Sequence, residues 1–463
     1  MSSIYGILNM ASRALMAHQQ SINVTGNNIA NVNTPGYSRQ RLMLSTSDPL
    51  HSPIGTIGNG VYAVGVERIY DRFIGVQINT ENQSLGRWAA QKQVMAGVEI
   101  IFDESRGFGL SQAISDYFSA WQELSMDPDG ITERQMLISK GEALASSFNQ
   151  KYAELESAQK SIDMDIHGAV ENISQISAQI ADLNAKIVNS EISGHTANEY
   201  RDQRDLALKE LSELIDISTF EDQSGSVKVT LNGGRTLVDG KTYHKLSTQV
   251  NPGTGLFDVM WHHHDGSAVD ITGNITGGKM QGWLEARDVT LQDYMTRLND
   301  LAIAIRDEVN REHRGGFGLD ESTNIDFFTG TDASDIQVNL SVVNDHNLIA
   351  AASDIDSLPG DGGNAVDIAD LQNLAILNGG TVTFDEYYNA LVSDVGSEVV
   401  QIDAYYQHQF DMLTQLENYR ESISGVSLDE EMVNLVKFQS AYDASAKLIT
   451  TTDELIQTVL NMV

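Results

Sequence analysis

The sequence predicts a mainly α-helical protein, built as a nested multidomain rod with a β insertion. Three observations support this fold class. Apolar side chains recur at helical spacing over both ends of the chain and over three interior segments. A segment with glycine turns and strand-like alternation interrupts these helices. The chain also has 463 residues, which exceeds the length at which a single hydrophobic core usually divides into domains.

Each end of the chain is predicted to form one amphipathic helix. Positions on one helix face are separated alternately by four and three residues, which is the spacing of a coiled-coil seam. Because an isolated helix with one seam gains little stability, we expect the two terminal helices to pair. The N-terminal seam consists of Ile4, Leu8, Ala11, Leu15, His18, Ile22, Thr25 and Ile29. The C-terminal seam consists of Met432, Leu435, Gln439, Tyr442, Ala446, Ile449, Asp453, Ile456 and Leu460.

Three interior segments show the same periodicity and are predicted to form a long helical bundle. The first covers most of 150–189, the second follows residue 284, and the third begins after residue 382. Capping boxes mark two helix starts, Thr383 with Glu386 and Ser427 with Glu430. The predicted buried positions are Ile162, Ile166, Ala169, Ile173, Ile176, Ile180, Leu183 and Ile187 in the first segment, Leu291, Leu298, Ile305 and Val309 in the second, and Tyr388, Leu391, Val395, Ile402, Tyr405 and Met412 in the third.

A small β-rich domain is predicted between these helices. Short alternating segments such as "SVKVTL" and "LFDVMW" are bounded there by the turn signals "NGG", "VDG" and "NPGTG". Because helices precede and follow it, this domain is an insertion into the rod. The predicted division of the chain is a terminal helical domain of 1–35 with 427–463, a mostly helical bundle of 36–217 with 284–426, and a β-rich outer domain of 218–283.

The composition excludes several classes of function. Acidic residues outnumber basic ones by 64 to 29, giving a formal net charge of -35, which argues against nucleic acid as a partner. The chain has no cysteine, and therefore no disulfide, thiolate metal site or cysteine nucleophile. The sequence contains neither a Sec-type signal peptide at its start nor an apolar run of membrane-spanning length. We therefore expect no membrane insertion and no cleaved signal.

One stretch stands out because it lacks charge in this acidic chain. Between Arg13 and Arg39 there is no Asp, Glu, Lys or Arg. Like charges brought together in a poorly hydrated layer repel one another. A helix that is polar but uncharged outside its seam therefore suits identical copies packed side by side around an axis, and we expect every face of this helix to meet another copy of the protein.

The same stretch ends in a predicted turn. Thr34 precedes Pro35 and is therefore pushed toward an extended backbone. Pro35 fixes φ at the second position of a turn, and Gly36 supplies the positive φ of its third position, as in a type II turn. This turn ends the first helix. The neighbouring amides tolerate caps and can bond backbone groups without adding charge: Asn27, Asn28, Asn31 and Asn33.

These residues carry a family resemblance. "NNIANVNTPGYSRQ" resembles the signature of bacterial flagellar rod, hook and hook-associated axial proteins, and the last forty residues are similar to their paired terminal helix. Three internal stretches, "YRDQRDLALKELSELIDIS", "GGKMQGWLEARD" and "VTFDEYYNALVSDVGSEV", resemble the family of hook-associated protein 1, the first hook-filament junction proteins. The motif residues that carry the resemblance are Asn28, Asn31, Thr34, Pro35, Gly36 and Tyr37.

The resemblance implies a non-enzymatic structural subunit of the flagellum. Such a protein is exported by the flagellar type III apparatus with the help of a chaperone, and forms an extracellular layer between hook and filament. The implied partners are further copies of itself, the hook protein and the second hook-filament junction protein. The seam residues expected to supply the assembly interface are Leu8, Leu15, Ile22, Ile29, Leu435, Tyr442, Ile449 and Ile456.

Other functions remain as alternatives. The chain could be a hook or filament subunit that polymerises indefinitely, a secreted adhesive accessory protein, or a cell-wall hydrolase. Hydrolysis would need a pair of placed carboxylates, and none is identifiable, so no catalytic residue or cofactor is predicted. The run from His262 to His264 is interpreted as an edge strand or surface turn, with a metal site as the alternative.

Overall fold

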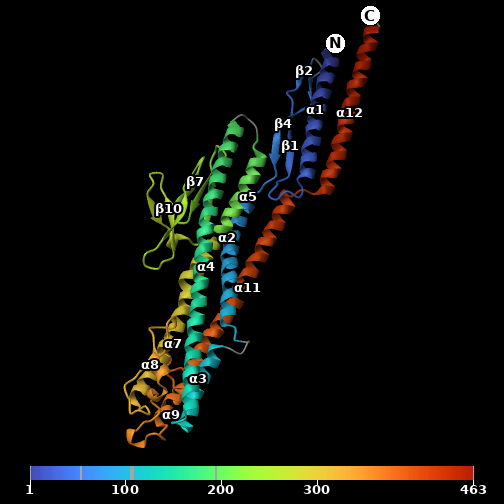
Figure 1. The fold of residues 1–463 in the computed structure, drawn as a ribbon. Helices are drawn as coiled ribbons and strands as arrows, with labels where there is room; N and C mark the ends of the chain where they lie inside the picture. Colours follow the sequence, from blue (N-terminus) through green and yellow to red (C-terminus); the bar gives the residue numbers. More distant parts are fainter. Residues whose placement is uncertain (1, 53–54, 105–108, 193–195, 462–463) are drawn as a thin grey trace.

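The protein is an elongated rod with both chain ends at one tip (Figure 1). The structure is a computed structural model that describes residues 2–52, 55–104, 109–192 and 196–461. Its helices are α1 (Ser2–Ala30), α2 (Arg72–Phe102), α3 (Leu110–Met126), α4 (Ile131–Ile192), α5 (Asn198–Leu214), α6 (Gly278–Glu285), α7 (Leu291–Gly315), α8 (Leu340–Asn344), α9 (Gly363–Asp370), α10 (Leu377–Gly380), α11 (Phe384–Ser424) and α12 (Leu428–Asn461).

The strands form small antiparallel sheets. One two-stranded sheet pairs β1 with β4 near the terminal helices, and another pairs β2 with β3. The strands are β1 (Gln40–Thr46), β2 (Leu50–Ser52), β3 (Gly55–Ile57), β4 (Val61–Arg68), β5 (Ile217–Glu221), β6 (Val227–Leu231), β7 (Thr236–Asp239), β8 (Thr242–Tyr243), β9 (Leu246–Val250), β10 (Phe257–His262), β11 (Ala268–Asp270), β12 (Phe328–Thr329) and β13 (Gln337–Val338). The predicted fold class, mainly α with a β insertion, is confirmed.

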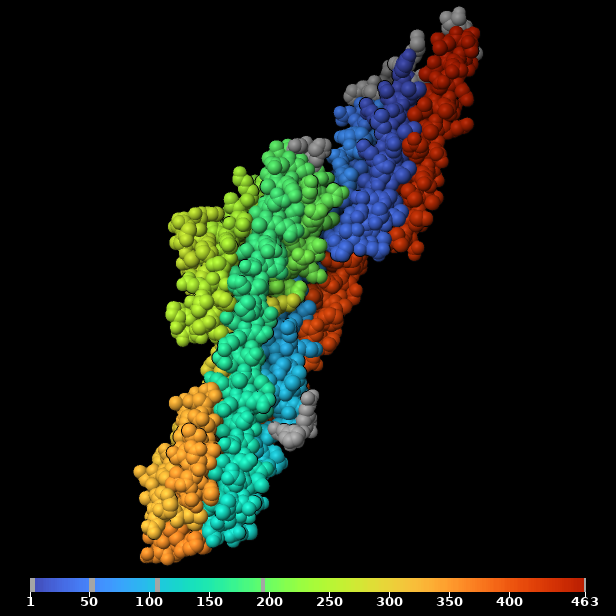
Figure 2. Space-filling view, in the orientation of Figure 1, coloured from blue at the N-terminus to red at the C-terminus, as the bar shows by residue number. Residues whose placement is uncertain are grey.

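Helix α4 is the spine of the rod (Figure 2). All the positions predicted to be buried between Ile162 and Ile187 are buried, as are those predicted for α7. The helix nevertheless begins at Ile131, earlier than the periodicity near residue 150 suggested. Its first turns bury Leu137, Leu144 and Phe148 in the same core, so the apolar face continues although it is no longer a regular repeat of isoleucines. Tertiary packing therefore extends the helix.

The heptad predicted for α11 is correct only in the first half of the helix. The predicted positions that are buried are Tyr388, Leu391, Val395 and Ile402. Tyr405 and Met412 are exposed instead, and Gln409 and Leu413 occupy the buried face. A straight α-helix has 3.6 residues per turn, so a strict seven-residue repeat drifts by about 20° per heptad. The predicted stripe therefore rotates toward the edge of the contact between α11 and α2, where the exposed Tyr405 ring still stacks on Trp88 of α2.

The β insertion projects from the side of α4 (Figures 1 and 2). It contains a four-stranded sheet in the order β5-β6-β7-β8 and a three-stranded sheet in the order β11-β10-β9. Arg287, in the π-helical turn that joins α6 to α7, anchors it to the spine. The Arg287 guanidinium donates to the Asp163 carboxylate at 2.6 Å and to the Phe257 carbonyl at 2.8 Å.

Glycines allow close packing where α6 crosses α2 and α5. A Cβ added at Gly86 on α2 would lie 2.2 Å from the carbonyl oxygen of Glu213, and one at Gly282 would lie 2.4 Å from that of Arg87. Gly278 has a φ of +73° and lies equally close to the backbone at the end of α5. The glycines of the "GGKMQGW" segment are therefore required by backbone contact between helices.

Because of this contact, we expect alanine substitutions at two glycines of α2 to have different effects on stability. Gly86→Ala should destabilise the protein by about 1–3 kcal/mol, because backbone atoms must shift to admit the methyl group. Gly97→Ala is the matched control, since its Cβ would meet nothing within 4 Å. It should be neutral or stabilising by up to about 1 kcal/mol through helix propensity. Urea denaturation of both variants measures the effect, and equal stabilities would contradict this account.

His313, at the tip of the rod distant from the termini, makes the stability of the protein depend on pH in a predictable direction. Its ring is buried and neutral: Nδ1–H donates to the Ile325 carbonyl at 2.7 Å, and Nε2 accepts from the Ala350 amide at 3.0 Å. Burial lowers the pKa of His313 to about 4. Between that pH and its ordinary value near 6.5, the unfolded chain binds more protons than the folded one, so stability falls as pH falls.

We therefore expect His313 to contribute a loss of about 2 kcal/mol of unfolding free energy between pH 7 and pH 5. His313→Gln should be less stable than the parent at pH 7 but should lack this part of the pH dependence. Urea denaturation at the two pH values measures both slopes. Parallel slopes for variant and parent would show that His313 is not the titrating group.

Candidate functional site

The terminal helix pair brings the two predicted seams together. α1 and α12 run antiparallel and pack against each other, and β1 and β4 also contact α1 (Figure 1). The side chain of Ile4 lies outside the described part of the structure. The predicted interface positions are half-buried in this single chain: Leu8, Leu15, Ile22, Ile29, Leu435, Tyr442, Ile449 and Ile456.

The C-terminal seam is turned relative to the prediction. Met432, Gln439, Asp453 and Leu460 are exposed, although the heptad placed them on the face toward α1. Leu435, Tyr442, Ile449 and Ile456 stay half-buried along the whole helix, so the predicted stripe is offset to one side of the contact with α1. The fully buried side chains of the pair are small or polar: Ala11, Ala17, Ser21, Thr25, Asn28, Glu431 and Thr452. The large seam residues thus lie at the margins, where a further element is needed to cover them.

The predicted turn is present after α1. The Tyr37 amide donates to the Thr34 carbonyl at 3.2 Å, and Gly36 has a φ of +76°, as a type II turn requires. Asn31 donates from Nδ2 to the Asn27 carbonyl at 3.0 Å, and the Thr34 hydroxyl donates to Asn31 Oδ1 at 3.0 Å. The amide side chains therefore cap the end of α1 without introducing charge.

Asn28 is the centre of this turn. It is 1% exposed and makes four hydrogen bonds. Its Nδ2 donates to the Gln40 carbonyl at 2.9 Å and to Glu431 Oε2 at 3.0 Å. Its Oδ1 accepts from the Gln40 amide and from the Tyr37 hydroxyl, each at 2.9 Å. One neutral side chain thereby joins α1, the turn, β1 and α12, and all its donors and acceptors are satisfied.

A buried ion pair completes the joint between the two ends. The Glu431 carboxylate is 2% exposed and accepts from Arg39 Nε at 2.9 Å. Arg39 also binds Glu430 at 2.8 Å, and its amide donates to the Ser424 carbonyl at 2.9 Å. The predicted capping box at Ser427 forms in one direction, because its hydroxyl accepts from the Glu430 amide at 3.5 Å while the Glu430 carboxylate binds Arg39.

The turn also docks on the helical bundle. The Ser38 amide donates to Asp202 at 3.0 Å, and Arg68 at the end of β4 binds Asp202 at 2.9 Å and Asp205 at 2.6 Å. A Cβ at Gly36 would lie 3.3 Å from Leu206 on α5. Burial raises the pKa of Asp202, while the Ser38 amide and Arg68 oppose that rise. Burial, with nearby carboxylates, likewise raises the pKa of Tyr37.

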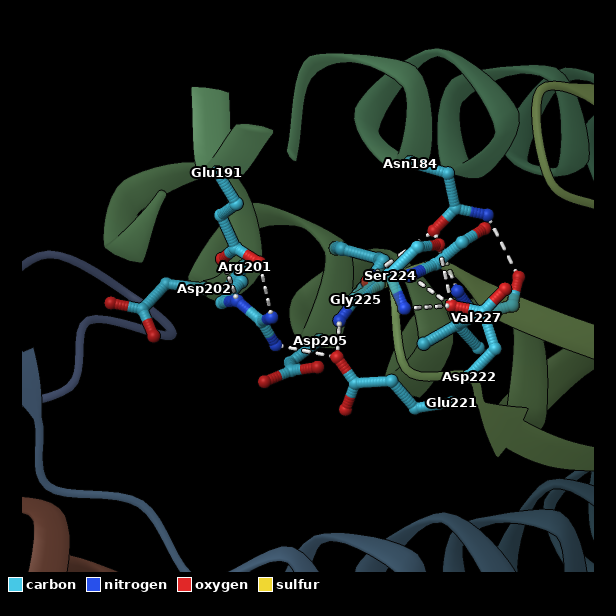
Figure 3. A network of polar contacts seen from close by, with 12 residues as sticks. Asn184, Glu191, Arg201, Asp202, Asp205, Glu221, Asp222, Ser224, Gly225 and Val227 are labelled. Atoms are coloured by element: carbon cyan, nitrogen blue, oxygen red, sulfur yellow. Dashed lines mark hydrogen bonds and ion pairs between the residues drawn. The ribbon is translucent and has the colours of Figure 1, made fainter. Parts of the chain in front are cut away.

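The same helix α5 continues this polar network into the β insertion (Figure 3). Arg201 bridges Glu191 at 2.7 Å and Glu221 at 2.5 Å. Arg204, 1% exposed, binds the Gly225 carbonyl at 2.6 Å, Asn184 at 3.1 Å and Glu221 at 3.2 Å. The alternating charges of "YRDQRDLAL" therefore bind two different parts of the molecule. The aspartates bind the turn and β4, and the arginines bind the insertion.

Sequence reasoning missed the charged half of this site. It identified Asn28 and the turn but not Arg39, Glu431, Asp202 or Arg68. The sequence contains only indirect signals for these residues. Arg39 ends the charge-free stretch, and Asp202 lies in "YRDQRDLALKELSELIDIS", a segment that indicates the family but not the contacts of its side chains. Pairs so far apart in the chain leave no periodic pattern.

The histidine run lies on the β insertion. His262 ends β10 and its Nε2 lies 2.7 Å from the Ser247 hydroxyl, while the His263 ring packs edge-on against Trp261. Across the described ranges, no three His, Asp or Glu side chains converge as metal ligands would. The described helices also include none that is both long and apolar enough to cross a bilayer.

Comparison with known proteins identifies first the class and then the family. Both ends match models of flagellar rod proteins: residues 8–37 match "Flagella basal body rod protein" and residues 420–462 match "Flagellar basal body rod FlgEFG protein C-terminal". The paired terminal helices are thus those of a flagellar axial protein. Residues 95–328, half of the chain, match the model "Flagellar hook-associated protein FlgK helical domain". The chain belongs to the flagellar hook-associated protein FlgK family.

Individual relatives agree with this assignment. The chain is 28% identical to flagellar hook-associated protein 1 of Bacillus subtilis strain 168, over 100% of this chain and 99% of that protein. It is 27% identical to the protein of the same name from Escherichia coli K12, over 98% and 99%. The fold is similar to that of the flagellar hook junction protein FlgK from Burkholderia pseudomallei, with a TM-score of 0.67 at 15% identity, covering 75% of this chain and 100% of the other. The predicted resemblance is confirmed, and the chain is a structural component of the flagellum.

The geometry around Asn28 predicts a large effect for its removal. Asn28→Ala leaves the Gln40 peptide groups and part of the Glu431 carboxylate buried without partners, at about 1–3 kcal/mol for each group. We expect amide hydrogen exchange in α1 and β1 to become at least about tenfold faster. Asn23→Ala is the control, because Asn23 is exposed on the same helix. Equal exchange rates in the two variants would contradict a central role for Asn28.

Proposed function

We propose that the protein is the subunit of the junction layer between hook and filament, on which flagellin polymerises. The observation that carries this proposal is the terminal pair, in which α1, whose one charged side chain is Arg13, and its partner α12 leave their large seam residues half-covered. The full-length likeness to proteins named flagellar hook-associated protein 1 supports the junction rather than another position along the flagellum.

Assembly supplies the missing cover. Full burial of an apolar side chain stabilises by about 1.5–3 kcal/mol relative to exposure, so closing the half-covered seams between copies is a substantial driving force. The chain's own elements explain part of the absence of charge in α1 after Arg13, since β1, β4 and α12 already cover some faces of this helix. The remaining faces would meet neighbouring copies.

The proposed domain division follows this role. Residues 1–35 with 427–463 would line the inner tube, the bundle of 36–217 with 284–426 would surround it, and 218–283 would face outward. The contact of β1 and β4 with α1 favours counting 40–68 with the terminal pair. The finer partners are proposals too: further copies of this chain, the hook protein, the second junction protein, the type III export apparatus and its chaperone, with an extracellular final location.

The test is electron microscopy of cells that lack this gene, with flagellin measured in the medium. We expect bare hooks and monomeric flagellin outside the cells, because flagellin would have no layer on which to polymerise. Re-expression of the parent chain should restore filaments and serves as the control. Intact filaments on normal hooks would overturn the junction role and favour an adhesive accessory protein. Growth of the purified chain into long fibres would favour a hook or filament subunit.

A further inference from the structure

A groove opens on the terminal pair beside the Asn28 joint. It has a volume of about 280 Å³ and lies between α1, β1 and α12. Its floor is the charge-free part of α1, at Ser21, Val24 and Thr25. Its walls carry large apolar side chains from the other two elements, Leu44 and Phe438 among them. Leu44 is 44% exposed, so the groove has an uncovered apolar wall in the described part of the chain.

The same pair of helices presents an apolar ridge. On one flank of α12, exposed positions recur at helical spacing, and we call this set the α12 stripe: Val433, Ala444, Leu448, Thr451, Leu455 and Val459. Leu448, Leu455 and Val459 are 41%, 55% and 46% exposed. The charged side chains on this flank are Lys437 and Glu430, and the Glu430 carboxylate binds Arg39. The opposite flank carries exposed polar residues at Gln439, Thr450 and Gln457. Its exposed apolar side chains, Leu428, Met432 and Val436, are confined to the first turns of α12.

Charge restricts what can enter the groove. Between Ala14 and Val66 the only charged side chains are Arg39, Arg41 and Asp48, whereas the chain as a whole has a net charge of -35. Arg39 is already bound by Glu430 and Glu431. Copies of so acidic a chain repel one another except where their surfaces lack carboxylates. The groove and the α12 stripe are poor in free carboxylates: Glu431, which lines the groove, is 2% exposed and paired with Arg39, and Glu430 at the start of the stripe flank also binds Arg39. Every copy carries both surfaces.

We propose that the α12 stripe of one copy docks in the groove of the next copy. A helix that places apolar side chains into a groove between helices and a strand is an established mode of recognition. The two surfaces differ, so the contact is heterologous and can be repeated from copy to copy around a layer. This inference rests on the proposed function, because it assigns the contact by which the layer is built.

The absence of cysteine makes the test direct. Leu44→Cys on the groove wall is combined, in the full-length chain, with one cysteine at Val433, Ala444, Leu448, Leu455 or Val459. Leu44→Cys is combined in the same way with Gln439→Cys, Thr450→Cys or Gln457→Cys as matched controls on the opposite flank. Each double variant replaces the parent in cells, filament-bearing hooks are isolated after mild oxidation, and intermolecular disulfides are scored on non-reducing gels.

We expect cross-linked dimers and longer ladders with one or two neighbouring stripe positions, because a disulfide forms only when the Cα atoms lie within about 7 Å. The stripe position that forms the disulfide shows how far α12 of one copy is displaced along the groove of the next copy. Filaments that form normally without any stripe cross-link, or cross-links that are as frequent on the control flank, would overturn this contact while leaving the junction role intact. The junction role itself is judged separately, by the phenotype of cells that lack the gene.

Discussion

The buried carboxylate of Glu431 is the interaction on which the placement of both chain ends depends. A carboxylate removed from water is costly unless its charge is compensated and its oxygens are hydrogen-bonded. Here Arg39 supplies the charge, Asn28 supplies an amide, and the position in the first turn of α12 adds the favourable field of a helix N-terminus. These groups come from three separate segments. The end of α1, the start of β1 and the start of α12 are therefore held together, because separating any one of them would leave the buried carboxylate without a hydrogen-bond or charge partner.

Charge is partitioned along the molecule in a way that matches this joint. The charged pairs that bind the terminal pair to the bundle, Arg39 with Glu431 and Arg68 with Asp202, are largely enclosed within one copy. The open surface of α1 beyond Arg13 is amide, hydroxyl or apolar, whereas α12 exposes acidic side chains such as Asp443, Asp453 and Glu454. A chain with this excess of acid would therefore approach its own copies most easily along α1, whereas the acidic helical bundle would hold copies apart by like charge.

The sequence was sufficient for features whose signal is local or periodic. The turn at Pro35 and Gly36 follows from φ preferences alone, and the capping box at Thr383 forms as its spacing indicated. The core face of α4 was predictable because isoleucines repeat over many turns. Periodicity failed where a strict heptad was extended too far, as in α11 at Tyr405, because the helix rotates relative to the repeat. The partner of Arg39 could not be predicted, because nothing local connects it to residues nearly four hundred positions away.

The polar network on α5 links the terminal helix pair to the β insertion on the side of the rod. Asp202 holds the turn and β4, while Arg201 and Arg204, on the same helix, hold the β insertion through Glu221. Each of these groups is largely buried, so relative motion of the ends and the insertion would break charged hydrogen bonds away from water, where they are hardest to replace. The orientation of the insertion is therefore fixed by the same short helix that fixes the terminal pair. Copies packed through their terminal pairs would then carry their insertions outward at one repeated angle, without any contact between the insertions themselves.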